Sequence, residues 1–234
     1  LRLTATTAPR RAAVRSLVAK GKPAPPRPRR SAASAAAANR STGDGRLAIG
    51  APGESIGHAV HAGQVQPLRW KEARSTWAAY RAINQATAGV VGTNESGDQF
   101  GYQVQVTRGL TASGSYDIAI SATEKVGNAS AGSVTVANFT RSIYRTLTQN
   151  TKGVPGTAET ADDFGGGLGV LRTSPSRDTL LIGVPGEKRQ LPSPPVGYAM
   201  RSDGKKLSAS THWSSIPRFE DYNGATYTAW GRAF

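Results

Sequence analysis

The chain has 234 residues, no cysteine, 27 glycines, 14 prolines and a formal net charge of +14 at neutral pH. The lack of cysteine excludes disulfides, thiolate metal sites and a cysteine nucleophile. The chain contains no run of about eighteen apolar residues, so we predict no membrane span. Many glycines and prolines with few aromatic residues are typical of short strands joined by tight turns.

Most of the positive charge lies in residues 1–46, which hold eleven lysines and arginines against one acid. This segment is rich in Arg, Ala and Pro and has neither a helical nor a strand period. We therefore expect a disordered basic tail. The other 188 residues carry eighteen basic against fourteen acidic side chains. The charge thus predicts nonspecific, salt-sensitive attraction to anionic surfaces and no specific nucleic-acid site.

An internal repeat is the most informative pattern in the chain. Residues 85–101 and 149–165 align without a gap at an offset of 64, with ten of seventeen positions identical, and both end in Phe-Gly. Such a period predicts stacked supersecondary units. The identical pairs are Gln85/Gln149, Thr87/Thr151, Gly89/Gly153, Val90/Val154, Gly92/Gly156, Thr93/Thr157, Glu95/Glu159, Asp98/Asp162, Phe100/Phe164 and Gly101/Gly165.

Alternating apolar residues between turn signals predict about four short strands in each unit. The first unit lacks its opening strand and begins at Leu47. After the start at Leu47, the later strands of the first unit are expected at 64–69 and 75–81. The expected strands of the central unit are 100–107, 116–121, 132–138 and 142–148, and those of the third are 164–171, 179–183, 196–200 and 207–213.

A second landmark is a glycine corner, because LAIGAPGE at 47–54 matches LLIGVPGE at 180–187. We expect the aromatic rings to fill the space between neighbouring sheets. We expect the glycines to allow close backbone approach, and the corners to turn the chain out of a strand. These structural motif residues are Phe100, Gly101, Phe164, Gly165, Gly50, Ala51, Pro52, Gly183 and Pro185.

The alternation of Phe-Gly with Gly-Ala-Pro resembles the FG-GAP repeat of integrin α-subunit N-terminal β-propellers and their bacterial relatives. The resemblance implies an all-β fold of propeller blades, each with four antiparallel strands. It covers a partial blade at 47–81, blades at 98–148 and 162–213, and a remnant at 216–234. About three blades indicate an incomplete propeller or a fragment, which further repeats of the same protein would complete.

The family often holds calcium in an Asp-rich loop between the first two strands of a blade. In the central unit the matching residues, 109–117, keep only Gly114 and Asp117 of that pattern. The third unit has Thr179 in place of the last aspartate, with Asp178 beside it. One carboxylate cannot supply the six or more oxygens that calcium takes. Calcium binding would therefore rest on Asp117 in a degenerate loop, and we expect no cofactor.

Three patterns that suggest catalysis have simpler interpretations. Residues 53–57, GESIG, fit the G-x-S-x-G serine-hydrolase pattern around Ser55, but no strand enters and no helix leaves this motif. His58, His61 and His212 form no convincing ligand set. The acid pairs Glu95/Asp98 and Glu159/Asp162 recur with the repeat, which favours capping of turn amides. We therefore expect no enzyme activity.

The resemblance implies a secreted or cell-surface module for cell adhesion, which binds an unknown protein or glycan ligand. No signal peptide is visible in this sequence, so the expected localisation rests on the family resemblance alone. Two alternatives remain open, namely an accessory propeller of a secreted hydrolase such as a phospholipase and a degenerate, truncated remnant.

Overall fold

The computed structural model describes residues 38–41, 44–126, 129–154, 156–186, 197–202, 207–212, 219–220 and 226–227. Within these ranges the structure is all β apart from one three-residue 3-10 helix, Glu72–Arg74. The predicted all-β class with antiparallel sheets is therefore confirmed. Most of the expected basic tail, residues 1–37, lies outside the described residues.

Three four-stranded antiparallel sheets make up the fold, and in each the strands pair in chain order. The first sheet consists of β1 (Ala38–Ser41), β2 (Asp44–Ala51), β3 (Gln64–Lys71) and β4 (Thr76–Ala79). The middle sheet consists of β5 (Val104–Arg108), β6 (Tyr116–Ala122), β9 (Ser133–Asn138) and β10 (Tyr144–Leu147). The third sheet consists of β11 (Gly167–Ser174), β12 (Arg177–Gly183), β13 (Gly197–Ser202) and β14 (Leu207–His212).

Two short hairpins complete the described strands. β7 (Lys125–Val126) pairs with β8 (Ala129–Ser130) in the connection between β6 and β9. β15 (Phe219–Glu220) pairs with β16 (Thr226–Tyr227) inside the expected C-terminal remnant. Among the described residues, the remnant therefore adds a two-stranded hairpin and no fourth four-stranded sheet.

The first sheet is more complete than the sequence predicts. β1 pairs with β2 from Ala38 opposite Leu47 to Ser41 opposite Asp44. The expected partial unit at 47–81 is thus corrected to four strands, and the expected boundary after residue 46 falls inside β2. In the other two sheets the opening strands begin later than predicted, at Val104 and Gly167, because each Phe-Gly pair lies in a corner ahead of its strand.

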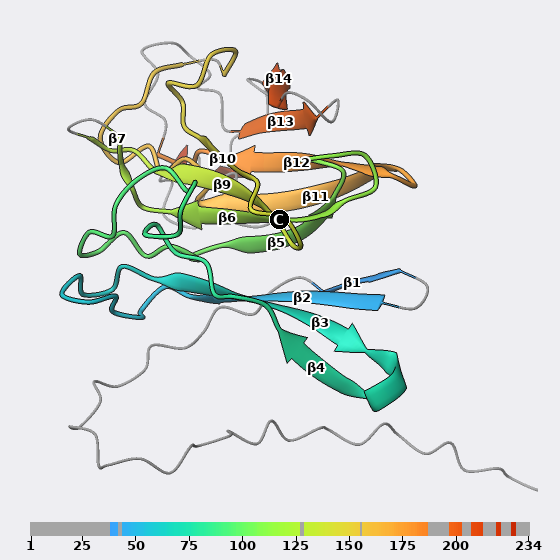
Figure 1. Cartoon of the computed structure of the whole chain (residues 1–234). Helices are drawn as coiled ribbons and strands as arrows, with labels where there is room; N and C mark the ends of the chain where they lie inside the picture. Colours follow the sequence, from blue (N-terminus) through green and yellow to red (C-terminus); the bar gives the residue numbers. More distant parts are fainter. Residues whose placement is uncertain are drawn as a thin grey trace, which may run out of the picture.

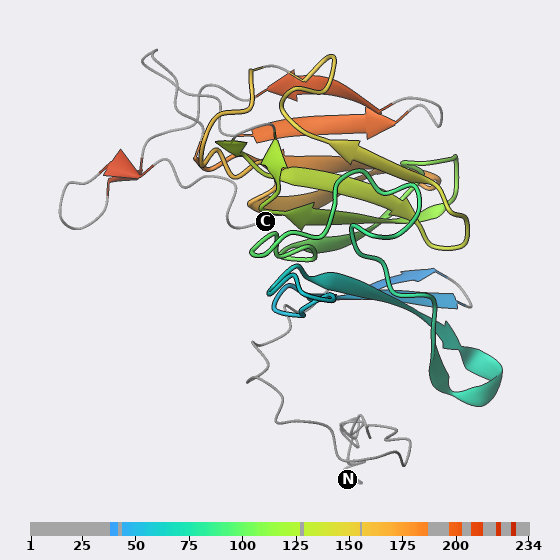
Figure 2. The same ribbon diagram turned by 60° about the vertical axis from the view of Figure 1, so that its left-hand side comes forward.

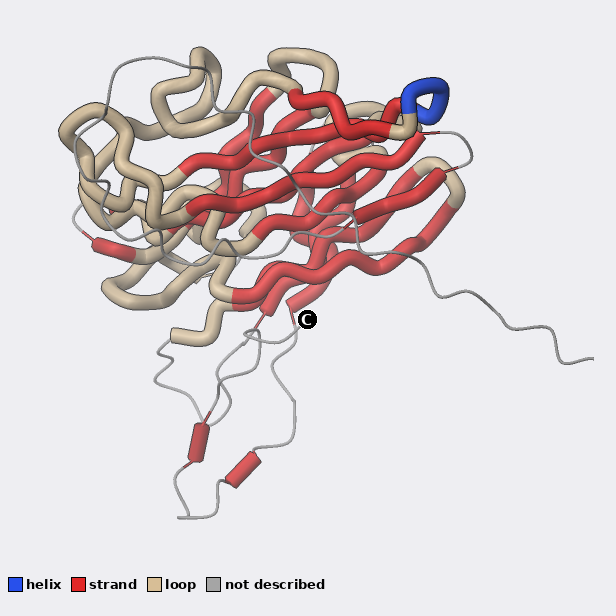
Figure 3. Tube along the Cα trace, turned by 90° about the horizontal axis from the view of Figure 1, so that it is seen from below, coloured by secondary structure: helices blue, strands red, loops and turns tan. Residues whose placement is uncertain are grey.

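The three sheets lie one upon another, with the middle sheet between the other two (Figures 1 and 2). From below, their strands run in roughly the same direction, and most loops gather at one end (Figure 3). The described sheets remain three separate ladders, and none closes on itself. The arrangement is therefore an open stack of sheets.

A separate hydrophobic cluster fills each space between sheets. Side chains alternate across a strand, so neighbouring residues of β6 face opposite sheets. The space between the first and middle sheets holds Ala48, Val65, Phe100, Val104, Val106, Ile118 and Ile120. The space between the middle and third sheets holds Ala119, Val134, Val136, Phe164, Leu168, Leu180 and Ile182.

The Phe-Gly corner makes the same contact at both spaces. Phe100 donates its backbone N–H to the carbonyl of Ala62 at 2.8 Å, and Phe164 donates to the carbonyl of Ala131 at 2.7 Å. Both rings are only 1% exposed. Each corner therefore docks on the sheet that precedes it in the chain, just before the third strand of that sheet.

Close approach at this contact requires glycine. Gly63 and Gly132 follow the two acceptor carbonyls and have positive φ angles of 83° and 85°. A Cβ on Gly63 would lie 2.3 Å from the carbonyl oxygen of Phe100, and one on Gly132 would lie 2.6 Å from that of Phe164. These backbone atoms cannot move away without undocking the corner, so a side chain is excluded at both positions.

The corners also fix which residues of the three sheets are equivalent. Gly101 donates to the carbonyl of Ser121 in its own sheet, and Gly165 donates to that of Gly183, both at 2.9 Å. Gly101 also packs against Gly50 of the first sheet, as Gly165 packs against Ser121 of the middle sheet. Gly50, Ser121 and Gly183 therefore occupy one repeated position near the end of the second strand.

The remaining motif residues form the turns next to this position. Ala51 ends β2, and Pro52 begins the turn that follows it. Pro185 lies in the turn after β12, where a Cβ on Gly166 would meet its ring at 2.8 Å. The Gly-Ala-Pro and Gly-Val-Pro corners are thus parts of the junctions between sheets.

We predict that Gly63→Ala and Gly132→Ala each lower the free energy of unfolding by about 3 kcal/mol, since both a positive φ and a backbone clash are imposed. Gly97→Ala is the matched control, because Gly97 has φ 91° and open space around its Cβ direction. It should cost about 1 kcal/mol. Urea unfolding measures all three, and equal losses would contradict the close docking.

Candidate functional site

Asp117 lies at the start of β6 with its side chain fully buried. Its Oδ2 accepts hydrogen bonds from the backbone N–H groups of Leu110 at 2.8 Å and Thr111 at 3.0 Å, and from the Ser115 hydroxyl at 2.8 Å. Its Oδ1 accepts from the Thr111 hydroxyl at 2.5 Å and from the Asn138 side-chain amide at 3.0 Å. The carboxylate therefore holds the loop before β6 closed through five donors.

This arrangement does not fit calcium. A cation needs oxygens that face it, whereas both oxygens of Asp117 face N–H and O–H groups. In the third sheet, Asp178 accepts the backbone N–H of Arg108 at 2.8 Å and lies 3.6 Å from the Arg172 guanidinium. Throughout the described ranges, no three His, Cys, Asp or Glu side chains cluster in a way that could hold a metal.

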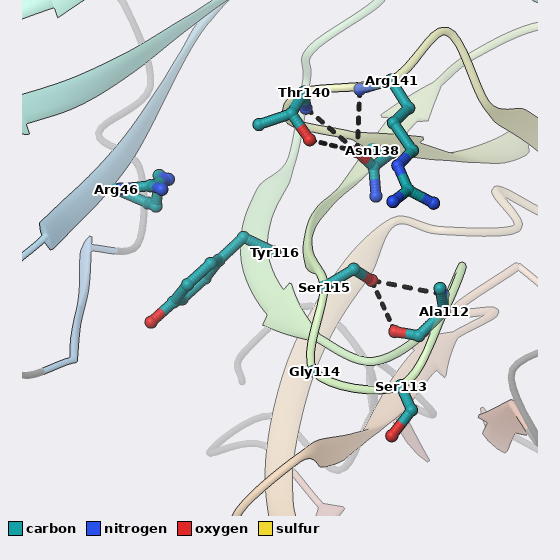
Figure 4. A pocket seen from close by; sticks show the side chains of 9 residues that line it. All are labelled: Arg46, Ala112, Ser113, Gly114, Ser115, Tyr116, Asn138, Thr140 and Arg141. Carbon is teal, nitrogen blue, oxygen red and sulfur yellow. Dashed lines mark hydrogen bonds between the residues drawn. The ribbon is translucent and has the colours of Figure 1, made fainter.

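An open cleft of about 320 Å³ lies beside the Asp117 loop. In Figure 4, Arg141 extends from the turn after β9 toward residues 112–115, and Arg46 comes from the first sheet beyond Tyr116. The cleft is thus built from three segments far apart in the sequence. Its lining consists of Arg46, Ala112, Ser113, Gly114, Ser115, Tyr116, Asn138, Thr140 and Arg141.

Hydrogen bonds and ring contacts fix the frame of the cleft. The side-chain oxygen of Asn138 accepts the backbone N–H groups of Thr140 and Arg141, each at 2.9 Å. The guanidinium carbons of Arg46 and Arg108 lie 4.9 and 4.8 Å from the centre of the Tyr116 ring, within cation–π range. Both loops and the ring are therefore held in place without a ligand.

Charge in the cleft is of one sign. Two arginines line it and no acid does, and the carboxylate of nearby Asp117 is buried and fully hydrogen-bonded. Arg141 and Ser113 are exposed to solvent. Guanidinium and hydroxyl groups bind carboxylates, sulfates and sugar hydroxyls, so the cleft suits an anionic or hydroxyl-rich group.

The serine-hydrolase pattern has no catalytic geometry. Ser55 lies among turns after β2, where its hydroxyl accepts the backbone N–H of His61 at 3.4 Å. No helix follows the motif, and His58 and His61 are exposed. The strand–turn–helix elbow that this chemistry requires is thus lacking at residues 53–63. The third histidine, His212, ends β14, and its side chain lies outside the described part of the structure.

The recurring acid pairs cap turns, as predicted. Asp98 accepts the backbone N–H of Glu95 at 2.7 Å, and Asp162 accepts that of Glu159 at 2.5 Å. The two aspartates are buried and occupy equivalent places just ahead of the Phe-Gly corners. Their role is to position the corner that follows.

Glu124 is a perturbed acid that the sequence analysis missed. Burial, with Asp98 and Glu95 nearby, raises its pKa to about 7, although Gln85 donates a hydrogen bond to it. The carbonyl of Glu124 accepts the N–H of Gly132, as that of Glu54 accepts the N–H of Gly63. Alignment of Glu124 with the glutamate that follows each glycine corner could have identified it.

The cleft residues Arg46, Asn138 and Arg141 also escaped prediction. They lie outside the repeated motif, and only the folded sheets bring them together. The Asp117 loop, where the sequence suggests a degenerate calcium site, nevertheless lies beside the cleft.

No protein-family model matches this chain, and no curated protein sequence matches it. The resemblance to FG-GAP repeats therefore rests on its motif residues. As expected from the sequence, the described residues contain no helix with the length and apolar character needed to cross a bilayer.

Replacement of Asp117 by asparagine should lower the free energy of unfolding by about 3 kcal/mol, since an amide NH2 would face groups that donate to the carboxylate. Glu159→Gln removes the same charge from an exposed side chain and should change the free energy of unfolding little.

Thermal melts with and without EDTA should give melting temperatures that agree within about a degree. A large loss of stability in EDTA would instead indicate that the loop holds a cation.

Glu124 also predicts a pH dependence. Its pKa is about 7 in the folded chain against 4.5 ordinarily, so folding favours the protonated form. The stabilisation is complete below pH 4.5 and is lost as the pH rises through 7. Glu124→Gln should therefore raise stability at pH 8 by about 1 kcal/mol, because partial exposure screens the effect.

Thermal melts of wild type and Glu124→Gln between pH 5 and pH 8 measure this difference. Glu54→Gln is the matched control, because Glu54 occupies the equivalent position and is exposed. Identical pH profiles for wild type and Glu124→Gln would contradict the raised pKa.

Proposed function

We propose that this chain is a non-catalytic FG-GAP-type module of an extracellular or cell-surface protein, which binds a protein or glycan ligand. In this proposal the stacked sheets are blades of an integrin-α-like propeller. The main support is the repeated junction, in which Phe100 and Phe164 dock on equivalent positions of successive sheets. That junction explains why Phe-Gly and the glycine corner occur together.

The basic cleft supports a binding role for the loops. It is open, it is lined by Arg46 and Arg141, and its frame is already hydrogen-bonded. A preformed frame lowers the ordering entropy that a ligand would otherwise have to overcome. The cleft therefore suits the anionic or hydroxyl-rich end group of a larger ligand better than a buried cofactor.

The hydrogen bonding inside the Asp117 loop supports the same proposal. Ser113 and Gly114 at the loop tip are exposed, and the buried carboxylate of Asp117 holds the loop through hydrogen bonds. Loops on a rigid sheet scaffold are common binding elements. The tip can therefore contact a ligand without any change in the sheet.

A glycan array that includes sulfated and carboxylated sugars, probed with the full chain at physiological salt, tests this function. Arg141→Ala should weaken binding by about tenfold, the loss of one charge-assisted contact. Arg81→Ala removes an equal charge from an exposed site outside the cleft and should leave binding unchanged.

Equal losses in both variants would mean that the general positive charge, and not the cleft, attracts the ligand. Turnover of an ester or glycoside substrate by the purified chain would contradict the non-catalytic assignment.

A further inference from the structure

Where β2, β3 and β4 form it, the outer face of the first sheet is mainly apolar, and the register of β1 adds Arg40 at its edge, opposite Gly45. We define this leading face as the side of the sheet that faces away from the middle sheet. Paired residues of antiparallel strands share a face. The strand registers therefore place these described residues on it: Ala38, Arg40, Gly45, Leu47, Ile49, Ala51, Gln64, Gln66, Leu68, Trp70, Trp77 and Ala79.

Two tryptophans lie at one end of the leading face. The rings of Trp70 and Trp77 meet edge to face with their centres 5.4 Å apart, and both pack over Gly45. Trp77 is 42% exposed although it is a large hydrophobic side chain. An exposed aromatic side chain on a mainly apolar sheet face indicates a contact surface.

One position on this face is fully buried in the other two sheets. Ile49, Ile120 and Ile182 occupy equivalent positions, because they directly precede Gly50, Ser121 and Gly183, respectively. Ile120 and Ile182 are 0% exposed because each packs against the preceding sheet. Ile49 and Leu47 are only half-buried. The leading face of the first sheet therefore lacks, among described residues, the cover that its equivalents have.

The opposite end of the stack presents the complementary face. We define the trailing face as the side on which the next sheet packs, and in the third sheet it includes Leu171 and Leu181. Ala48 and Ala119, the equivalents of Leu181, are 0% exposed beneath the next sheet. Leu181 is half-buried, and Leu171 on the same face is 56% exposed. Among the described residues, each end of the stack thus exposes a large apolar side chain, Trp77 at one end and Leu171 at the other.

We propose that two copies of this chain associate head to tail, with the leading face of the first sheet in one copy packed on the trailing face of the third sheet in the other. Both junctions inside the chain join these same two faces, so the contact continues an interface that the fold already uses twice. Because the two faces differ, the contact is heterologous, and two such contacts can close a pair of copies into a ring.

The contact between copies is weaker than the junctions within the chain. The position 64 residues before Phe100-Gly101 is Ala36-Ala37, so the first sheet contributes no Phe-Gly corner. Without a buried ring at the junction, association depends on the apolar faces alone. We therefore expect reversible association with a Kd of roughly 1–100 µM.

Sedimentation velocity of the full chain across that concentration range tests the proposal. Trp77→Lys on the leading face and Leu171→Lys on the trailing face should each weaken association at least tenfold, since a charge would be buried. Val91→Lys is the control, because Val91 is exposed in a loop outside both faces. Ala79→Arg is a second leading-face variant, and far-UV circular dichroism verifies that every variant is folded.

A mixture of Trp77→Lys and Leu171→Lys is the decisive sample. Each variant retains the face that the other has lost, so the mixture should form a dimer through one intact contact although neither variant does so alone. A wild-type chain that stays monomeric, or a mixture that associates no better than its components, would overturn the proposal. Loss of association in only one of the two variants would also overturn it, because two like faces would then pair.

Discussion

Each Phe-Gly corner reaches back onto the sheet that precedes it, and this docking joins three separate ladders into one stack. The docked backbone requires glycine at Gly63 and Gly132, and it aligns the second strands at Gly50, Ser121 and Gly183. Burial of the aromatic ring supplies apolar contact on both sides of the junction. The turns capped by Asp98 and Asp162 lie just ahead of the corners and set their path. The spacing of the repeat is thus the spacing between successive junctions.

Much of the fold could be predicted because the junction imposes its residues on the sequence. β6 was expected at 116–121 and spans Tyr116–Ala122, since alternation and flanking turns agree there. β1 was missed because its residues, Ala-Asn-Arg-Ser, have low strand propensity, and pairing with β2 decides their conformation. The cleft could not be predicted, since Arg46 and Arg141 come from different sheets and belong to no motif. Asp117 lies beside the cleft, and its carboxylate accepts five hydrogen bonds.

Hydrogen bonds from protein groups close the loop at Asp117. In a calcium loop, carboxylates converge on a cation, whereas here one buried carboxylate receives five donors from the loop and from β9. Both arrangements neutralise a buried charge and fix the loop. A loop fixed in this way leaves exposed serine, glycine and arginine groups at the sheet end.

The proposed binding role and the proposed association of copies use different parts of the same stack, so either can be correct without the other.

Native-state hydrogen exchange of the Phe100 and Phe164 amides tests the central claim most directly. Both amides are donors in the docking contact, to Ala62 and Ala131. If docking holds the sheets together, both should exchange only through global unfolding, with equal free energies that match the unfolding free energy from urea. Exchange of either amide as fast as that of exposed loops, or protection of one without the other, would contradict the account.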